Sequence, residues 1–153
     1  MLYDNALLAQ VYLHAWQVFG FERWRCIAEE TIEYVLRDLR LPQGGFASAQ
    51  DADSEGSEGR FYLWEEDEIR AICGSDAQQV IDWYGIIPSG NFEGLNILYR
   101  PVRGDLLRPP RIEHARSILL QARNKRIAPA LDNKVLTEWN ALMLAALTQA
   151  AVA

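Results

Sequence analysis

Helical periodicity runs through most of this 153-residue chain. Apolar residues recur at three- and four-residue steps from Leu7 to Phe19, and Gly20 ends the pattern. A second periodic run follows at once and extends from Glu22 to Leu39. Two amphipathic helices joined by so short a connection are expected to lie antiparallel. The sequence therefore predicts that the chain opens with a helical hairpin.

Four further helices are predicted after this hairpin. They are expected from Glu65 or Glu66 to Cys73, from a Ser75 cap to Tyr84, after Pro109-Pro110 as far as Arg123, and from Leu136 onward, with residues 85–108 irregular. In the last helix, Glu138 is the only charge and apolar residues stand on nearly every side. A helix that is apolar all round is expected to be buried.

Half-solvated helices thus alternate with apolar ones, as a two-layer ring of helices requires. The prediction is a mainly all-α chain, an incomplete toroid of helical hairpins with one short β-hairpin-like excursion, treated as one domain over residues 1–153. The chain closes on the apolar run 145–153 without a helix stop. We therefore expect it to be a piece of a longer protein.

The excursion is acidic. Two short flanks, 44–50 and 60–64, are expected to form a two-stranded ribbon around residues 51–59. Asp51, Asp53 and Glu55 stand at alternate positions, so in an extended chain they would project from one face about 7 Å apart. Their repulsion must be relieved by solvent, by a proton or by a cation.

Each of these solutions corresponds to a different role for the segment. It could be a solvated turn, a calcium site, or a pair of carboxylates for acid/base work on a sugar. An EF-hand is excluded because Tyr62 stands where that loop needs a bidentate Glu. A less regular calcium site stays open, and no other metal or cofactor is expected.

Several classes of function are excluded by charge and by residue spacing. A net charge of -6 offers no basic face, so neither nucleic acid nor a membrane is an expected partner. Cys26 and Cys73 lie far apart without a C-x-x-C motif, which indicates reduced, buried thiols and a reducing, cytoplasmic compartment. His14 and His114 are isolated on different helices and are expected to be structural or surface residues.

Four phrases, in order, resemble the spermatogenesis-associated, thioredoxin-domain-containing family found in bacteria and animals. They are residues 1–6, 44–56, 59–64 and 134–140, and Asp51 to Gly56 is the most specific of them. The chain departs from the family pattern at Asn133, where a second Asp is common, and at Ala141, where Gly is usual.

This resemblance implies a longer protein with an N-terminal thioredoxin-like domain followed by a six-hairpin, glycosidase-like (α/α)6 toroid. The present chain would be an early part of that toroid. Similar toroids in N-acylglucosamine 2-epimerases and glycoside hydrolases carry their sites at the rim. The related epimerases also use paired His residues, which this stretch does not supply.

The leading hypothesis is a carbohydrate-binding or carbohydrate-processing toroid, glycosidase- or epimerase-like. Asp51 and Asp53 are the candidate catalytic acids. The expected substrate-binding residues are Tyr3, Asp4, Glu55, Trp64, Trp139 and Asn140, with the two Trp side chains stacking on a sugar ring. Against this stand ordinary core packing for the aromatic residues and simple helix capping for Asp4 and Asp132.

A rival hypothesis is a non-enzymatic structural or protein-interaction module, with the acidic segment solvated or clamped by calcium. Under either hypothesis, the isolated piece is expected to lack activity, because part of a ring cannot close a pocket. Its exposed inner helices are also expected to promote oligomerisation.

Overall fold

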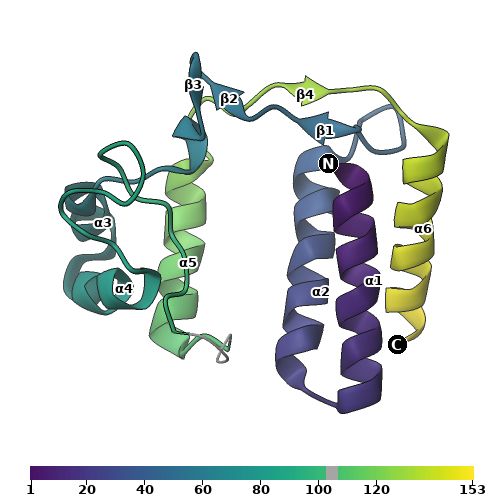
Figure 1. Cartoon of the computed structure of the whole chain (residues 1–153), viewed down its shortest axis with the longest axis horizontal. Helices are drawn as coiled ribbons and strands as arrows, with labels where there is room; N and C mark the ends of the chain where they lie inside the picture. Colours follow the sequence, from purple (N-terminus) through teal and green to yellow (C-terminus); the bar gives the residue numbers. More distant parts are fainter. Residues whose placement is uncertain (103–106) are drawn as a thin grey trace. The chain divides into compact units, whose positions relative to one another are not determined.

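The computed structural model describes residues 1–102 and 107–153 and is mainly helical. The chain divides into two compact units. Unit 1 comprises Met1–Asp51 together with Ala130–Ala153, and unit 2 comprises Ala52–Pro129. Figure 1 shows that the two ends of the chain both belong to the helices of unit 1.

Three helices build unit 1: α1 (Leu2–Phe19), α2 (Glu22–Tyr34) and α6 (Thr137–Val152). Gly20 ends α1 in the left-handed conformation, with φ of 70°, and donates its N–H to the carbonyl of Trp16. α2 continues into one π-helical turn, Val35–Leu39. The predicted antiparallel hairpin of α1 and α2 is confirmed, and α6 packs on α1 as well (Figure 1).

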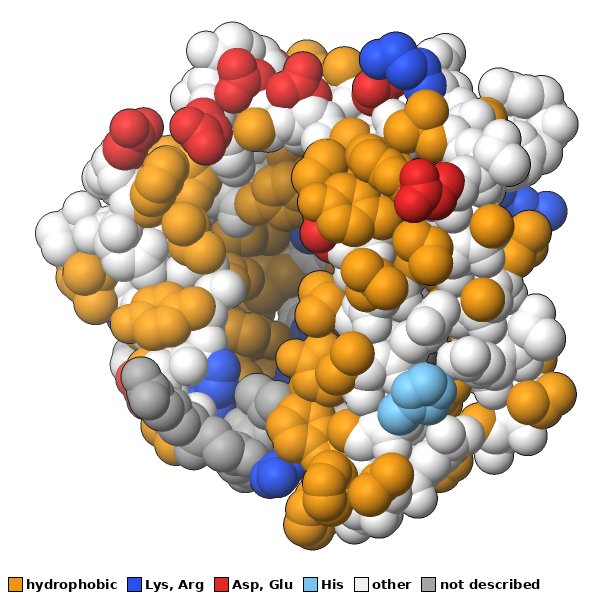
Figure 2. All heavy atoms as spheres, turned by 45° about the vertical axis from the view of Figure 1, so that its right-hand side comes forward, with side chains coloured by type: hydrophobic (Ala, Val, Ile, Leu, Met, Phe, Trp, Pro, Cys, Tyr) orange, Lys and Arg blue, Asp and Glu red, His pale blue; other side chains and the backbone are white. Residues whose placement is uncertain are grey.

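The core of unit 1 lies where these helices meet. Its buried side chains are Leu2, Ala6, Ala9, Val35, Leu39, Phe46, Met143 and Ala146. The alanines of α1 and α6 leave room for close helix packing. One face of α6 remains outside this core, with Leu144 57% exposed and Val152 83% exposed. The prediction that this helix is buried all round is therefore wrong for this chain, because the described residues cover only part of the surface of α6. Figure 2 shows many such apolar side chains, in orange, at the surface.

The predicted helix caps are wrong. Asp4 lies inside α1, Asp132 lies in a strand, and Ser75 lies in a 3-10 turn that precedes α4 (Ala77–Tyr84). No side-chain cap forms at the start of any of these helices. For α1 the backbone supplies the partner instead, because the N–H of Leu2 donates to the carbonyl of Ser48 at 2.8 Å.

Two short antiparallel pairs replace the predicted ribbon. β1 (Ala49–Gln50) pairs with β4 (Leu131–Asp132) in unit 1, and β2 (Asp53–Ser54) pairs with β3 (Ser57–Glu58) in unit 2. The flank 60–64 forms a 3-10 turn at Arg60–Tyr62 instead of a strand. The hairpin closes inside the acidic segment, since Glu55 and Gly56 both adopt positive φ, 53° and 76°, as a two-residue type I′ turn requires.

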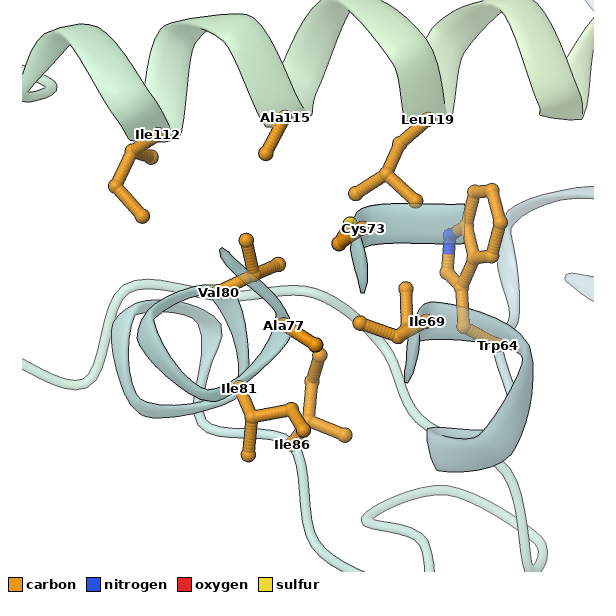
Figure 3. Close-up of a cluster of buried hydrophobic side chains, with 10 residues drawn as sticks. All are labelled: Trp64, Ile69, Cys73, Ala77, Val80, Ile81, Ile86, Ile112, Ala115 and Leu119. Carbon is orange, nitrogen blue, oxygen red and sulfur yellow. The ribbon is translucent and has the colours of Figure 1, made fainter. Parts of the chain in front are cut away.

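Unit 2 packs α3 (Glu66–Cys73), α4 and α5 (Pro110–Arg123) around its own core. Ile69, Val80 and Leu119 point into this core from the three helices, beside the ring of Trp64 (Figure 3). The three helices lie where the sequence predicted them. Between 85 and 108, the described residues form neither a helix nor a regular strand, as expected.

Asn96 organises this irregular segment. It is 1% exposed, accepts the N–H of Ile87 at 2.9 Å, and donates to the carbonyls of Ile87 and Trp64. Its backbone also exchanges two hydrogen bonds with Trp64. The loop therefore gains from one buried side chain the hydrogen bonds that a strand would gain from a neighbour.

Replacing Asn96 with Ala is expected to lower the free energy of unfolding by about 2–4 kcal/mol, because it removes three hydrogen bonds of a buried side chain and takes away the partner of the Ile87 N–H. Asn91 offers a matched control: it bonds both backbone groups of Ile97 in the same loop but is exposed. Asn91→Ala should cost only about 0.5–1.5 kcal/mol. Urea denaturation measures both changes, and equal losses would contradict this account of Asn96.

Candidate functional site

The residues singled out in the sequence fall into both units. Unit 1 contains Tyr3, Asp4, Asp51, Trp139 and Asn140, whereas unit 2 contains Asp53, Glu55 and Trp64. The candidate residues therefore form two separate groups, one in each unit.

In unit 1, the first turns of α1 and α6 lie at the same end as β1 and β4 (Figure 1). Backbone and side-chain bonds hold this end together. The carboxamide of Asn140 accepts the N–H of Phe46 at 2.8 Å and donates to its carbonyl at 3.2 Å. The segment that begins at Phe46 therefore bonds to α6 through Asn140 and to α1 through Ser48 and Leu2.

Tyr3 and Trp139 meet at this end. Their ring centroids are 4.8 Å apart with an interplanar angle of 56°, and both side chains are half-buried. Asp4 lies beside the phenol: its negative charge raises the pKa of Tyr3, with burial and a hydrogen bond from the hydroxyl to Asp4 acting in the same direction. Residues from the first and the last helix thus form one aromatic pair with a carboxylate next to it.

Asp51 lies on a groove of about 240 Å³ along the β1–β4 pair. The other lining residues are Ala49, Gln50, Ala130, Leu131 and Asp132. Asp132 forms an ion pair with Lys134 at 3.0 Å, and the hydrogen bond from Lys134 is the main cause that lowers the pKa of Asp132. Two carboxylates, Asp51 and Asp132, therefore line the same groove.

Asp132 has no place in the set of site residues inferred from the sequence, where it was expected only to cap a helix. Asp132 reaches the groove because β4 pairs with β1, which brings Asp132 opposite Ala49. Nothing in the sequence indicated this pairing. Asn140, in contrast, was expected to contact a substrate, and the structure shows that its carboxamide bonds to backbone at Phe46 and Leu136.

In unit 2, the acidic segment is a tight hairpin. Asp53 lies opposite Glu58 in the β2–β3 pair, and Glu55 in the turn forms an ion pair with Arg60 at 3.1 Å. Because the backbone of Glu55 has positive φ, the extended alternation that would place its side chain in line with those of Asp51 and Asp53 does not continue to Glu55.

Trp64 is 3% exposed and belongs to the core of unit 2. The guanidinium carbon of Arg126 lies 4.0 Å from the centre of its ring system. One guanidinium nitrogen of Arg126, Nη1, donates to the carbonyls of Phe61 and Leu63, and the other, Nη2, donates to both carboxylate oxygens of Glu68 at 2.8 Å. Stacking of Trp64 on a ligand would therefore require Arg126 to move away.

The cysteines, histidines and helix lengths bear on redox, metal and membrane functions. Cys26 and Cys73 are both free; Cys73 is buried and Cys26 is half-buried, while His14 and His114 are exposed. Among the residues that the structure describes, no group of three or more His, Cys, Asp or Glu side chains could hold a metal ion. No described helix is both long and apolar enough to span a bilayer.

Comparison with known proteins supports one family. No family model matches the chain. Curated relatives do match: spermatogenesis-associated protein 20 of Homo sapiens is 33% identical and that of Rattus norvegicus 34% identical, each over 94% of this chain. This chain is similar to spermatogenesis-associated protein 20. An uncharacterized protein of Caenorhabditis elegans is 25% identical over 98% of the chain.

These relatives support the family inferred from the four sequence phrases. The matches cover 23% of the human and rat proteins and 25% of the nematode protein. The chain therefore spans about a quarter of the length of the curated relatives it matches. The thioredoxin-like and glycosidase-like parts of the resemblance stay predictions.

Asp4→Asn is expected to lower the pKa of Tyr3 toward the ordinary value for tyrosine, because the substitution removes the negative charge that disfavours the phenolate. NMR titration of ring-labelled tyrosine measures this. Asp132→Asn is the control, since Asp132 is not among the causes that raise the pKa of Tyr3. An unchanged pKa in Asp4→Asn would show that the carboxylate does not act on this phenol.

Proposed function

We propose that the end of unit 1 built around Tyr3 and Trp139 binds a carbohydrate ring. The observation that carries the proposal is the 4.8 Å contact between these two rings, which come from opposite ends of the chain and remain half-exposed. A sugar offers an apolar face to an aromatic ring and hydroxyl groups to polar neighbours. Asp4 is such a neighbour, since its carboxylate already accepts a hydrogen bond from Tyr3.

The groove beside this end supplies the carboxylates that acid/base chemistry on a sugar needs. Asp51 keeps its role as the candidate general acid or base, and Asp132 is the second carboxylate on the same groove. Glycosidic cleavage uses two such groups flanking one bond. The hydrogen bond from Lys134 lowers the pKa of Asp132 and so favours its ionised form, which suits the role of nucleophile rather than that of general acid. The catalytic role expected of Asp53 stays a prediction.

The full-length protein would supply the rest of the pocket. We infer that this chain is part of an (α/α)6 toroid whose reaction is glycosidase- or epimerase-like; the family resemblance and the α1–α2 hairpin support this proposal. The exposed apolar faces of α1 and α6 favour further helices of the same protein packing against them. The 153-residue chain alone is expected to be inactive.

A second candidate function is a structural or protein-interaction module. The observation that favours it is the exposed apolar surface of α1, where Leu7, Val11 and Val18 are 45%, 61% and 75% exposed. A calcium clamp at the acidic hairpin has less support, because Glu55 already pairs with Arg60. Calcium titration of the wild type and of Asp53→Asn separates a module with a calcium clamp from one without. If the clamp exists, the wild type binds calcium and Asp53→Asn does not.

The test of the sugar proposal uses the full-length protein and a panel of monosaccharides and disaccharides. Trp139→Ala should weaken binding of the responding sugar about tenfold, and Asp51→Ala should remove turnover. Trp24→Ala is the matched control, because Trp24 forms the other Tyr–Trp pair of unit 1, stacked on Tyr12 at 5.5 Å.

Calorimetry gives the affinities, and thermal unfolding gives an independent reading, since a sugar at 100 times its Kd stabilises the folded state by about 2.7 kcal/mol. A panel without any thermal shift, and with Asp51→Ala indistinguishable from the wild type, would refute the proposal. If the Trp24 and Trp139 substitutions weakened sugar binding equally, the Tyr3–Trp139 pair would have only a packing role.

A further inference from the structure

Unit 2 contains a separate cleft of about 610 Å³, within the range of small-molecule sites. Its walls come from the acidic hairpin, the 3-10 turn, the start of α3, the 90–95 loop and the segment after α5. Glu55 is the only residue of this cleft that the sequence had marked as part of a site.

Two turns of the same kind form parts of the wall. Glu55-Gly56 and Glu93-Gly94 each have positive φ at both residues, 53° and 76° in the first and 48° and 82° in the second. Both are two-residue hairpin turns, the second closed by paired hydrogen bonds of 2.9 Å between Phe92 and Leu95. This turn type favours Asn, Asp or Gly at its first position, so Glu is an unfavourable choice for the backbone at both places.

The cleft is lined by more carboxylates than guanidinium groups. Glu55 pairs with Arg60, and Glu68 pairs with Arg126. Two further carboxylates, Glu65 and Glu93, line the cleft, and neither forms an ion pair with any residue that the structure describes. The cleft therefore keeps an excess of negative charge.

Apolar groups complete the lining. Ile127 is 64% exposed and Leu95 is half-buried, whereas the rings and branches of Phe61 and Leu63 are 7% and 6% exposed and lie deeper. An anion would meet the excess of carboxylates. A sugar would find no exposed aromatic face, because Phe61 is buried.

We propose that this cleft binds an aliphatic primary ammonium group, as carried by a lysine side chain or by a free diamine. Glu65 and Glu93 hold the ammonium group, and the methylene stem lies on Ile127 and Leu95. This function is separate from the sugar site proposed for unit 1, and failure of either leaves the other intact.

The test titrates the 153-residue chain with diaminopentane, with N-acetyl-lysine amide, and with pentanediol as a neutral control of the same length. Both amines should shift the NMR signals of Glu65, Glu93 and Ile127, and binding should weaken as salt increases. The diol should leave these signals unchanged. A lysine amide that binds as tightly as the diamine points to a peptide ligand, and one that binds much more weakly points to a free amine.

Variants separate recognition from turn structure. Glu65→Gln and Glu93→Gln should each weaken diamine binding about fivefold, whereas Glu58→Gln, an exposed acid of the same unit outside the cleft, should not. Glu93→Asn suits the turn better, so it should weaken binding while leaving the unfolding temperature unchanged or higher. Diol binding equal to that of the diamine, or unchanged amine affinity in both Gln variants, would overturn the proposal.

Discussion

Hydrogen bonds between residues 46–51 and residues 130–140 hold unit 1 together. The N–H of Ser48 donates to the carbonyl of Asp132 at 3.0 Å, and the N–H of Asp51 donates to that of Ala130 at 2.8 Å. Asn140 adds two bonds to Phe46. Ser48 is 2% exposed, so its polar groups need partners inside the protein. Apolar packing alone would leave α6 free to slide or rotate on α1, whereas these directional bonds fix where Trp139 meets Tyr3.

Unit 2 uses polar side chains in the same way. Asn96 bonds to backbone at Ile87 and Trp64, and Arg126 bonds to backbone at Phe61 and Leu63. Both side chains thus hold non-helical segments, at residues 61–64 and at residue 87, against the core of unit 2. In each unit, segments outside the helices therefore depend on a few well-bonded side chains, and the groove of unit 1 and the cleft of unit 2 lie along such segments.

Much of the helical structure could be predicted from the sequence, because apolar spacing at three and four residues survives in every long helix and Gly20 marks a clear end. The β1–β4 pair could not, since strands of two residues carry no periodicity and their partners are distant in the chain. The contact of Arg126 with the ring of Trp64 could not be predicted either, because the two residues are distant in sequence and no local pattern connects them. The cap at Asp4 failed because the carbonyl of Ser48, which is distant in sequence, takes its place at the start of α1. The cap at Asp132 failed because this residue pairs in β4, and α6 begins only at Thr137.

The pairing of residues 46–51 with residues 130–140 assembles the end of unit 1 on which the candidate sugar site lies. Hydrogen exchange resolved by residue tests it most directly. The account predicts slow exchange at the amides of Phe46, Ser48 and Asp51, and selective loss of protection at Phe46 in Asn140→Ala. Exchange at these three amides as fast as in an exposed loop, with α1 and α2 still protected, would contradict it.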